Sequence, residues 1–158
     1  MALINTPSPA THETRLIETL RQAQLRLTPQ RLAICRFLAG TDSHPTAQDV
    51  YRSLKPDFPS LSLATVYNTL EALVALGAIH VLGNAGDDAT HYDANTDPHI
   101  NLMCIHCHRI VDLPSQTVAT LEEEAATQSG FRILGARVIY YGVCPDCQNT
   151  NGSGNLFS

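Results

Sequence analysis

The sequence of 158 residues lacks any apolar run near the roughly 18 residues that a membrane-spanning helix requires. Its first residues also lack the basic stretch and apolar core of a secretory signal peptide. We therefore expect a cytoplasmic protein. The apolar fraction of 44% is typical of a folded chain with one ordinary domain or two small ones.

Basic residues are scarce in the second half of the chain. Residues 81–158 carry three Lys/Arg against nine Asp/Glu, whereas residues 1–80 carry seven against six. Any nucleic-acid contact is therefore expected in the first half, where phosphate-binding arginines gather in a short span. A solvated helix face explains this cluster equally well. Its members are Arg15, Arg21, Arg26, Arg31 and Arg36.

Cysteine is sparse and odd in number, with five residues in all. Four of them form two Cys-x-x-Cys pairs, Cys104 with Cys107 and Cys144 with Cys147. In a chain without an export signal this pattern favours metal binding, with two disulfides or a redox dithiol as the alternatives. Four thiolates complete a tetrahedral zinc shell with no open position, so we predict a structural zinc site. Cys35 stands alone among apolar residues and is expected to be buried.

Helix signals dominate the first half. A helix is expected from Thr14, and two further helices start at the caps Thr28 and Ser62. Another short helix is expected after His44-Pro45-Thr46. The helix capped by Ser62 ends at Gly77. Its periodicity turns three residues outward, with one more at the margin. The outward residues are Ala64, Thr65 and Asn68, and the marginal one is Tyr67.

Two short strand-like runs follow, over residues 78–82 and 90–94, and a polar turn joins them. A helical cluster followed by a hairpin is the element order of a winged helix-turn-helix domain. We expect this domain over residues 14–94, after a flexible tail over residues 1–13.

The pattern then changes to a second unit over residues 95–148, with a flexible tail over 149–158. We expect strands over 100–104, 109–113 and 131–143 and a helix over 117–128. The last strand is too apolar for an exposed edge, so it should pack across a subunit interface. The predicted fold class is therefore α+β, an N-terminal winged helix-turn-helix domain and a C-terminal α/β dimerisation domain with a four-cysteine zinc site.

Histidine and acidic residues are concentrated around the first cysteine pair. Residues 99 and 101 share one face of the predicted strand, and with a hinge aspartate they could form the mixed nitrogen and oxygen shell that suits Fe(II), Mn(II) or Zn(II). For any single histidine, a surface or hydrogen-bonded role is the alternative. The cluster comprises His91, Asp93, Asp97, His99, Asn101, His106, His108 and Asp112.

Several stretches, in order along the chain, resemble the ferric uptake regulator (Fur) family, and the resemblance runs from about Arg15 to Cys147. The family implies homodimeric repressors that bind palindromic double-stranded operators when a regulatory metal is loaded. The matching stretches are Leu27–Arg31, His44–Ala47, Ser62–Leu70, Cys104–Cys107 and Tyr141–Cys147.

By this resemblance the regulatory metal, Fe(II) or Mn(II) with Zn(II) possible, is held by His44, Asp93, His99 and Asp112. Many iron sensors of the family have Glu at the position of Asp93, and an aspartate there resembles the peroxide-responsive branch. In that branch Fe(II) reacts with peroxide, a ligand histidine is oxidised and DNA is released. Asn101 departs from the His-x-His motif that is usual in the family. An amide oxygen binds late first-row metals more weakly than imidazole does and is relatively better suited to Mn(II). His91 or His106 could supply the missing ligand.

For DNA, we predict that three residues of the fourth helix approach base edges, while Arg26 and Arg31 contact phosphates. The three are Thr65, Tyr67 and Asn68. A metal-uptake regulator without peroxide sensing is the first alternative. More distant ones are a zinc enzyme and a zinc-stabilised interaction module, but the chain has no His-Glu-x-x-His motif, and we expect no enzymatic activity.

Overall fold

The computed structural model describes residues 8–84 and 86–150. The chain divides into two compact units, Met1–Gly83 with Thr90–Asp97, and Asn84–Ala89 with Pro98–Ser158. Residues 1–7 and 151–158, which the sequence assigns to flexible tails, lie outside the described residues. No helix in the described part of the chain is long and apolar enough to cross a membrane.

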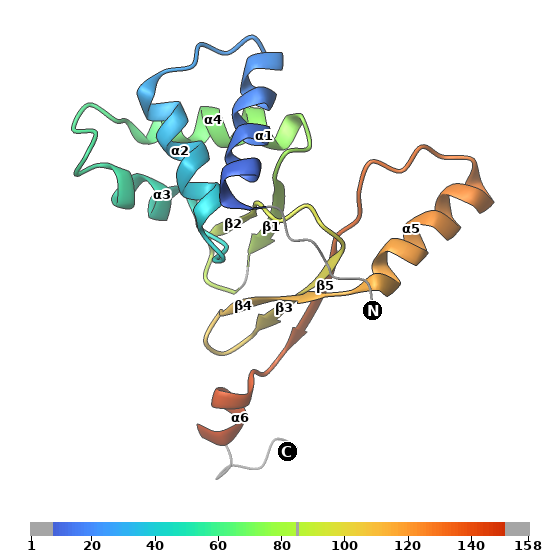
Figure 1. Ribbon diagram of the computed structural model, residues 1–158. Helices are drawn as coiled ribbons and strands as arrows, with labels where there is room; N and C mark the ends of the chain where they lie inside the picture. Colours follow the sequence, from blue (N-terminus) through green and yellow to red (C-terminus); the bar gives the residue numbers. More distant parts are fainter. Residues whose placement is uncertain (1–7, 85, 151–158) are drawn as a thin grey trace. The chain divides into compact units, whose positions relative to one another are not determined.

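The first unit consists of four helices followed by a two-stranded sheet (Figure 1). Its elements are α1 (Pro9–Gln22), α2 (Pro29–Gly40), α3 (Ala47–Leu54), α4 (Leu63–Ala75), β1 (His80–Asn84) and β2 (Thr90–Asp93). One apolar cluster from all four helices and β2 forms the core, with Leu16, Ile34, Val50, Val66 and Leu70 fully buried. This is the predicted winged helix-turn-helix architecture.

Side-chain caps explain where these helices begin. The hydroxyls of Thr28 and Ser62 accept backbone N–H groups at the starts of α2 and α4, as predicted. Thr46 and Asp49 form a reciprocal capping box at α3, and the backbone N–H of Thr46 lowers the pKa of Asp49. Helix α1 begins at Pro9, not at Thr14 as expected, because Ser8 caps it.

The second unit is a three-stranded sheet with two helices. Its elements are β3 (His99–Cys104), β4 (Ile110–Pro114), α5 (Gln116–Ser129), β5 (Val138–Gly142) and α6 (Pro145–Thr150). The strand order is β4-β3-β5, with β4 antiparallel and β5 parallel to the central β3. Helix α5 packs against β3 and buries Val118.

The expected strand over residues 131–143 is wrong for its first half. Only Val138–Gly142 is a strand, and residues 130–137 form no regular element. The β5 pairing starts at Ile100 opposite Val138, close to the start of β3, and Gly135 has a φ of 152°, which L residues rarely adopt. Phe131 and Leu134 are 73% and 82% exposed, so the apolar character of this segment reflects a surface.

Strand register separates two kinds of residue on the sheet. Asn101 lies opposite Asp112, and His99 is two residues away on the same face. Leu102 lies opposite Val111 on β4 and Tyr140 on β5, on the other face. The sheet therefore has a polar face with three candidate ligands and an apolar face whose residues are largely exposed.

Candidate metal centres and DNA-binding face

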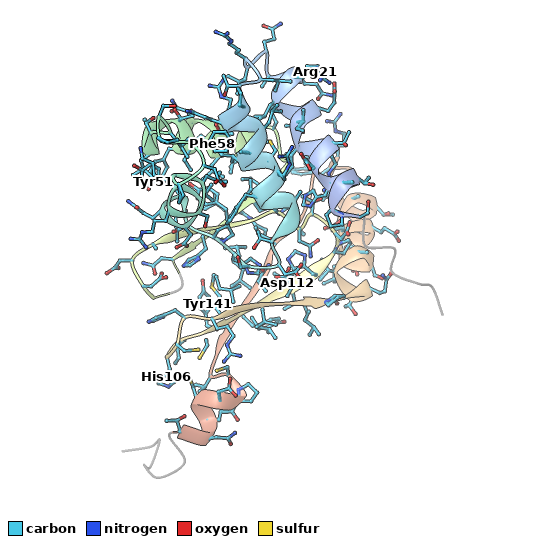
Figure 2. All side chains as sticks on the ribbon, turned by 60° about the vertical axis from the view of Figure 1, so that its left-hand side comes forward. Arg21, Tyr51, Phe58, His106, Asp112 and Tyr141 are labelled. Atoms are coloured by element: carbon cyan, nitrogen blue, oxygen red, sulfur yellow. The ribbon has the colours of Figure 1, made fainter. Side chains whose placement is uncertain are left out.

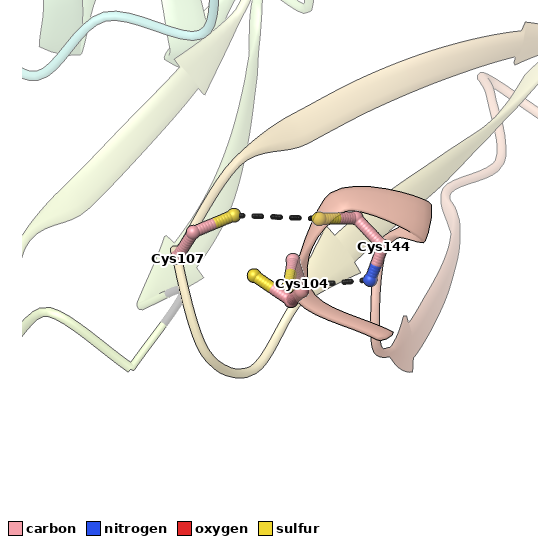
Figure 3. Close-up of side chains that lie close together, drawn as sticks. Cys104, Cys107 and Cys144 are labelled. Carbon is pink, nitrogen blue, oxygen red and sulfur yellow. Dashed lines mark hydrogen bonds between the residues drawn. The ribbon is translucent and has the colours of Figure 1, made fainter. Parts of the chain in front are cut away.

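The four predicted zinc ligands meet in the second unit. Cys104 and Cys107 lie at the β3–β4 turn, and Cys144 and Cys147 lie just after β5, where the parallel pairing brings them beside the first pair. Figure 3 shows Cys104, Cys107 and Cys144. Their four sulfur atoms all lie within 4.8 Å of one another. The Sγ atoms of Cys107 and Cys144 are 3.7 Å apart.

This geometry fits a tetrahedral metal and not a disulfide. Zinc–sulfur bonds of about 2.3 Å place neighbouring sulfurs about 3.8 Å apart, whereas a disulfide needs about 2 Å. Backbone N–H groups of Cys107 and Cys144 hydrogen-bond to the Cys104 sulfur and lower the pKa of this thiol to about 5, which favours the ligating thiolate. A hydrogen bond with Cys144 raises the pKa of Cys147 to about 12.

Cys35, by contrast, lies fully buried in the core of the first unit, as predicted. Burial raises the pKa of this thiol to about 12, so it stays protonated and behaves as a small apolar residue.

A buried imidazole–carboxylate pair occupies the first unit. The loop residues before α3 pair with β2, since the Tyr92 N–H donates to the Pro45 carbonyl and Thr46 bridges His91. This pairing brings His44 Nε2 to 3.9 Å from Asp93 Oδ1, with the two side chains 3% and 2% exposed.

The distance between His44 Nε2 and Asp93 Oδ1 suggests a shared metal ion. A distance of 3.9 Å is too long for a hydrogen bond, but two ligands of one metal ion, each about 2.1 Å from it, lie about 3 to 4 Å apart. The Nδ1 atom of His91 is 2.7 Å from the carbonyl oxygen of His44, so His91 supports the loop that carries the histidine. His44 and Asp93 therefore fit half of a metal shell.

Asp93 also shapes the last segment of the first unit. One of its carboxylate oxygens, Oδ1, accepts the Asn95 N–H at 2.8 Å, and the Asn95 side-chain oxygen accepts the Asp97 N–H at 3.1 Å. The same carboxylate that lies beside His44 thus holds the backbone that leads into the second unit.

The second unit carries an imidazole–carboxylate pair of its own. His99 Nε2 lies 3.7 Å from Asp112 Oδ1, again beyond hydrogen-bond distance. Asn101 lies directly opposite Asp112 in the register and is 1% exposed. Its side-chain oxygen has no hydrogen-bond partner in the described part of the chain. An unsatisfied buried amide oxygen is costly, and a cation would satisfy it. These three residues fit the mixed shell expected of a regulatory metal.

His106 does not lie with either imidazole–carboxylate pair. It is exposed on the β3–β4 turn of the second unit (Figure 2). Of the two candidate substitutes for the missing histidine, His106 is therefore exposed, whereas His91 is buried with its Nδ1 beside the His44 carbonyl.

The exposed face of α4 carries the residues predicted to approach bases. Tyr67 is 40% exposed and Asn68 is exposed, while Thr65 is half-buried and its hydroxyl hydrogen-bonds to the Ser62 cap. Near the start of α2, Arg31 donates to the Arg26 carbonyl at 2.7 Å.

The rest of the arginine cluster is paired. Arg15 hydrogen-bonds to Thr96, Arg21 to Glu18, and Arg36 to Glu13. The solvated-face alternative thus describes these three arginines better than phosphate binding does.

Comparison with known proteins decides the family. The model of the ferric uptake regulator family matches residues 22–141. This chain belongs to the ferric uptake regulator family. The peroxide-responsive repressor PerR of Staphylococcus aureus is 40% identical over 133 residues, which cover 84% of this chain and 89% of that protein.

Solved structures agree with this assignment. The Campylobacter jejuni peroxide stress regulator is 30% identical, with a TM-score of 0.66 over 84% of this chain and 98% of that chain. The Helicobacter pylori ferric uptake regulator Fur shares the fold at a TM-score of 0.70 and 19% identity, over 94% of this chain and 97% of that chain.

Sequence reasoning missed two residues beside the cysteines of this Fur-family protein. Arg109 donates to the Cys144 sulfur at 3.9 Å and pairs with Asp146, and this pairing raises the pKa of the arginine. The available signal was charge, because Arg109 is one of only three basic residues after residue 80.

We expect Arg109→Gln to release zinc faster, by roughly 10-fold, because a tetrathiolate zinc centre carries excess negative charge that an outer guanidinium partly offsets. The rate is measured as transfer of zinc to a chromogenic chelator. Arg132→Gln removes the same charge from an exposed position in this unit and serves as the control. Equal release rates for both variants would contradict a role for Arg109.

Proposed function

We propose that this chain is a homodimeric, metal-dependent DNA-binding repressor that acts in the cytoplasm and responds to peroxide. One observation carries the proposal: each unit holds an imidazole and a carboxylate too far apart for a hydrogen bond and close enough to share a cation. A structural zinc on the four cysteines accompanies this regulatory site.

The regulatory metal, Fe(II) or Mn(II), takes ligands from both units. The first unit supplies His44 and Asp93, and the second supplies His99, Asn101 and Asp112. A metal shared in this way favours one arrangement of the units over the others, so metal binding and DNA binding are thermodynamically coupled. In that arrangement the two α4 helices of the dimer meet successive major grooves of a palindromic operator.

DNA recognition is assigned to α4. Thr65, Tyr67 and Asn68 approach base edges, and Arg26 and Arg31 contact phosphates and position the domain. The exposure of Tyr67 and Asn68 supports this assignment.

Dimerisation is assigned to the apolar face of the second unit. Leu102, Val111, Leu113 and Tyr140 are exposed there, and Phe131 and Leu134 add to the apolar surface. Apolar surface of this extent favours cover by another subunit, and most soluble oligomers are symmetric homodimers.

Peroxide sensing is supported by Asp93 and by the similarity of this chain to a peroxide-responsive repressor and a peroxide stress regulator. An Fe(II) ion held by the proposed ligands would supply the electron that activates peroxide. His44 and His99 lie in the shell and are the side chains open to oxidation, and an oxidised imidazole no longer fits the site. Loss of the ligand then uncouples the two units and releases DNA.

Asn101 favours a second candidate function, a metal-uptake regulator that does not sense peroxide. An amide oxygen binds late first-row metals more weakly than imidazole and is better tolerated by Mn(II). Peroxide does not readily oxidise bound Mn(II), so a repressor that uses Mn(II) responds to the metal concentration alone.

Operator binding by the zinc-loaded dimer tests the proposal. Fe(II) or Mn(II) is added anaerobically, and binding is measured before and after a small dose of peroxide, with mass spectrometry of the peptides that contain His44 and His99. We expect Fe(II) to support binding, peroxide to abolish it, and one histidine to gain an oxygen atom. The Mn(II) form is the internal control and should keep both its DNA and its unmodified histidines.

Survival of the Fe(II) complex without oxidation would instead establish the uptake regulator, with the metal that gives the tightest binding as its signal. If neither metal changes the affinity for DNA, the metal-dependent repressor is excluded.

A further inference from the structure

The outer face of α4 carries one charged side chain. Ala64, Tyr67, Asn68 and Glu71 are exposed and recur at helical spacing, so they form a single stripe. Val66, Thr69, Leu70 and Leu73 face the core instead. Glu71 lies one turn beyond Tyr67 and Asn68 on the surface assigned to base recognition.

Glu71 is the only Asp, Glu, Lys or Arg in α4. In the described part of the chain no basic side chain forms an ion pair with it. Burial raises the pKa of Tyr92, and the charges of Tyr67 and Glu71 add to this rise. The stripe therefore ends in an exposed, unpaired negative charge.

An unpaired carboxylate is unfavourable beside a polyanion. The major groove is lined by phosphates, and a helix that enters it with a negative charge loses affinity for every sequence. The exception is a contact with an amino group on a base edge. Cytosine N4 and adenine N6 are the two such donors in the major groove, and adenine places the acceptor N7 next to its amino group. A carboxylate that only accepts hydrogen bonds is thus best matched by cytosine.

We propose that Glu71 is a specificity-determining residue that accepts a hydrogen bond from cytosine N4 in each half-site of the operator. The proposal rests on the DNA-binding function proposed above and adds the base that α4 selects. Glu71 lies three residues beyond Asn68, about 4.5 Å along the helix axis. The selected cytosine is therefore within about two base pairs of the base that Asn68 contacts, given a spacing of about 3.4 Å per base pair.

Selection from a random duplex library tests this assignment. The full-length dimer, loaded with zinc and Mn(II), is compared with Glu71→Ala and Glu71→Gln, and affinities are then measured on the enriched site and its single-base variants. The exposed position of Glu71 leaves folding intact, which thermal unfolding of each variant verifies. Glu123→Ala is the matched control, because it removes one exposed carboxylate from α5.

The wild-type protein should enrich cytosine at one position of each half-site and prefer it over thymine by between about 5-fold and 100-fold. Glu71→Ala should lose the preference at that position alone and bind duplexes that lack this cytosine more tightly than the wild type does. Glu71→Gln should shift the preference toward adenine, since an amide pairs with both N6 and N7 of that base. Glu123→Ala should leave every preference unchanged.

Identical base preferences for the wild type and both Glu71 variants would overturn the inference while leaving the proposed function in place. Failure of the wild-type protein to enrich any duplex would overturn the proposed function and this inference together.

Discussion

Cys144→Ser is expected to leave the full-length chain without bound zinc, without a cooperatively folded second unit and without a dimer. The apolar core of the protein lies in the first unit, whereas the buried apolar residues of the second are few, namely Met103, Cys104 and Val118. Zinc therefore replaces missing core, and structural zinc contributes on the order of 10 kcal/mol in small domains. Serine cannot supply the thiolate that completes the shell.

Zinc stoichiometry, thermal unfolding and analytical ultracentrifugation measure these three losses. Cys35→Ala is the matched control, because it removes a thiol that lies far from the cluster in sequence and is buried in the other core. This control should keep its zinc. A dimer of Cys144→Ser with full zinc content would show that the four cysteines do not act as one site.

His99→Ala is expected to abolish the gain in operator affinity that Mn(II) gives to the wild-type protein. Loss of an outer-shell partner already weakens metal affinity by 10- to 100-fold, so loss of a direct ligand should cost at least about 100-fold. Asp93→Ala, in the other unit, should have the same effect because both residues are assigned to one metal. Calorimetric Mn(II) titration of the free protein and fluorescence anisotropy with operator DNA measure the two affinities.

The double variant separates one shared metal from two independent ones. With a shared metal, loss of either half destroys the site, so the double variant should be no worse than the more damaged single variant. Additive losses would mean that each unit binds its own ion. His106→Ala, at the exposed turn, is the control and should respond to Mn(II) as the wild type does.

Local signals were sufficient to predict most of the first unit. Thr28, Thr46 and Ser62 each cap a helix in the structure, because a hydroxyl that accepts an orphan N–H is a property of a few adjacent residues. Ser8 with Pro9 gives the same signal at the start of α1, but the Pro- and Thr-rich composition around these residues predicts a tail. Composition was a poorer guide there than the cap.

Pairing between distant segments could not be predicted. The shared face of His99 and Asn101 follows from strand alternation, but the position of Asp112 opposite Asn101 depends on register. Likewise, the loop at His44 lies beside β2 through backbone hydrogen bonds from Tyr92 to Pro45, which any residues could make. Similarly, the apolar run before Val138 resembled a strand because exposed apolar surface and buried strand have the same composition.

The turns over residues 93–97 bear on the metal concentration at which the proposed sensor responds. Asp93 holds the backbone of Asn95, and Asn95 holds that of Asp97, within the segment that joins the units. On the proposed mechanism, the observed metal affinity equals the intrinsic affinity multiplied by a fraction. This is the fraction of metal-free molecules whose units are already in the arrangement that binds the metal. Substitutions in this segment alter that fraction. Each change of about 1.4 kcal/mol in the free energy of reaching the metal-binding arrangement shifts the metal concentration at which the protein responds about tenfold. Evolution can therefore retune the set point of such a regulator while every ligand stays in place.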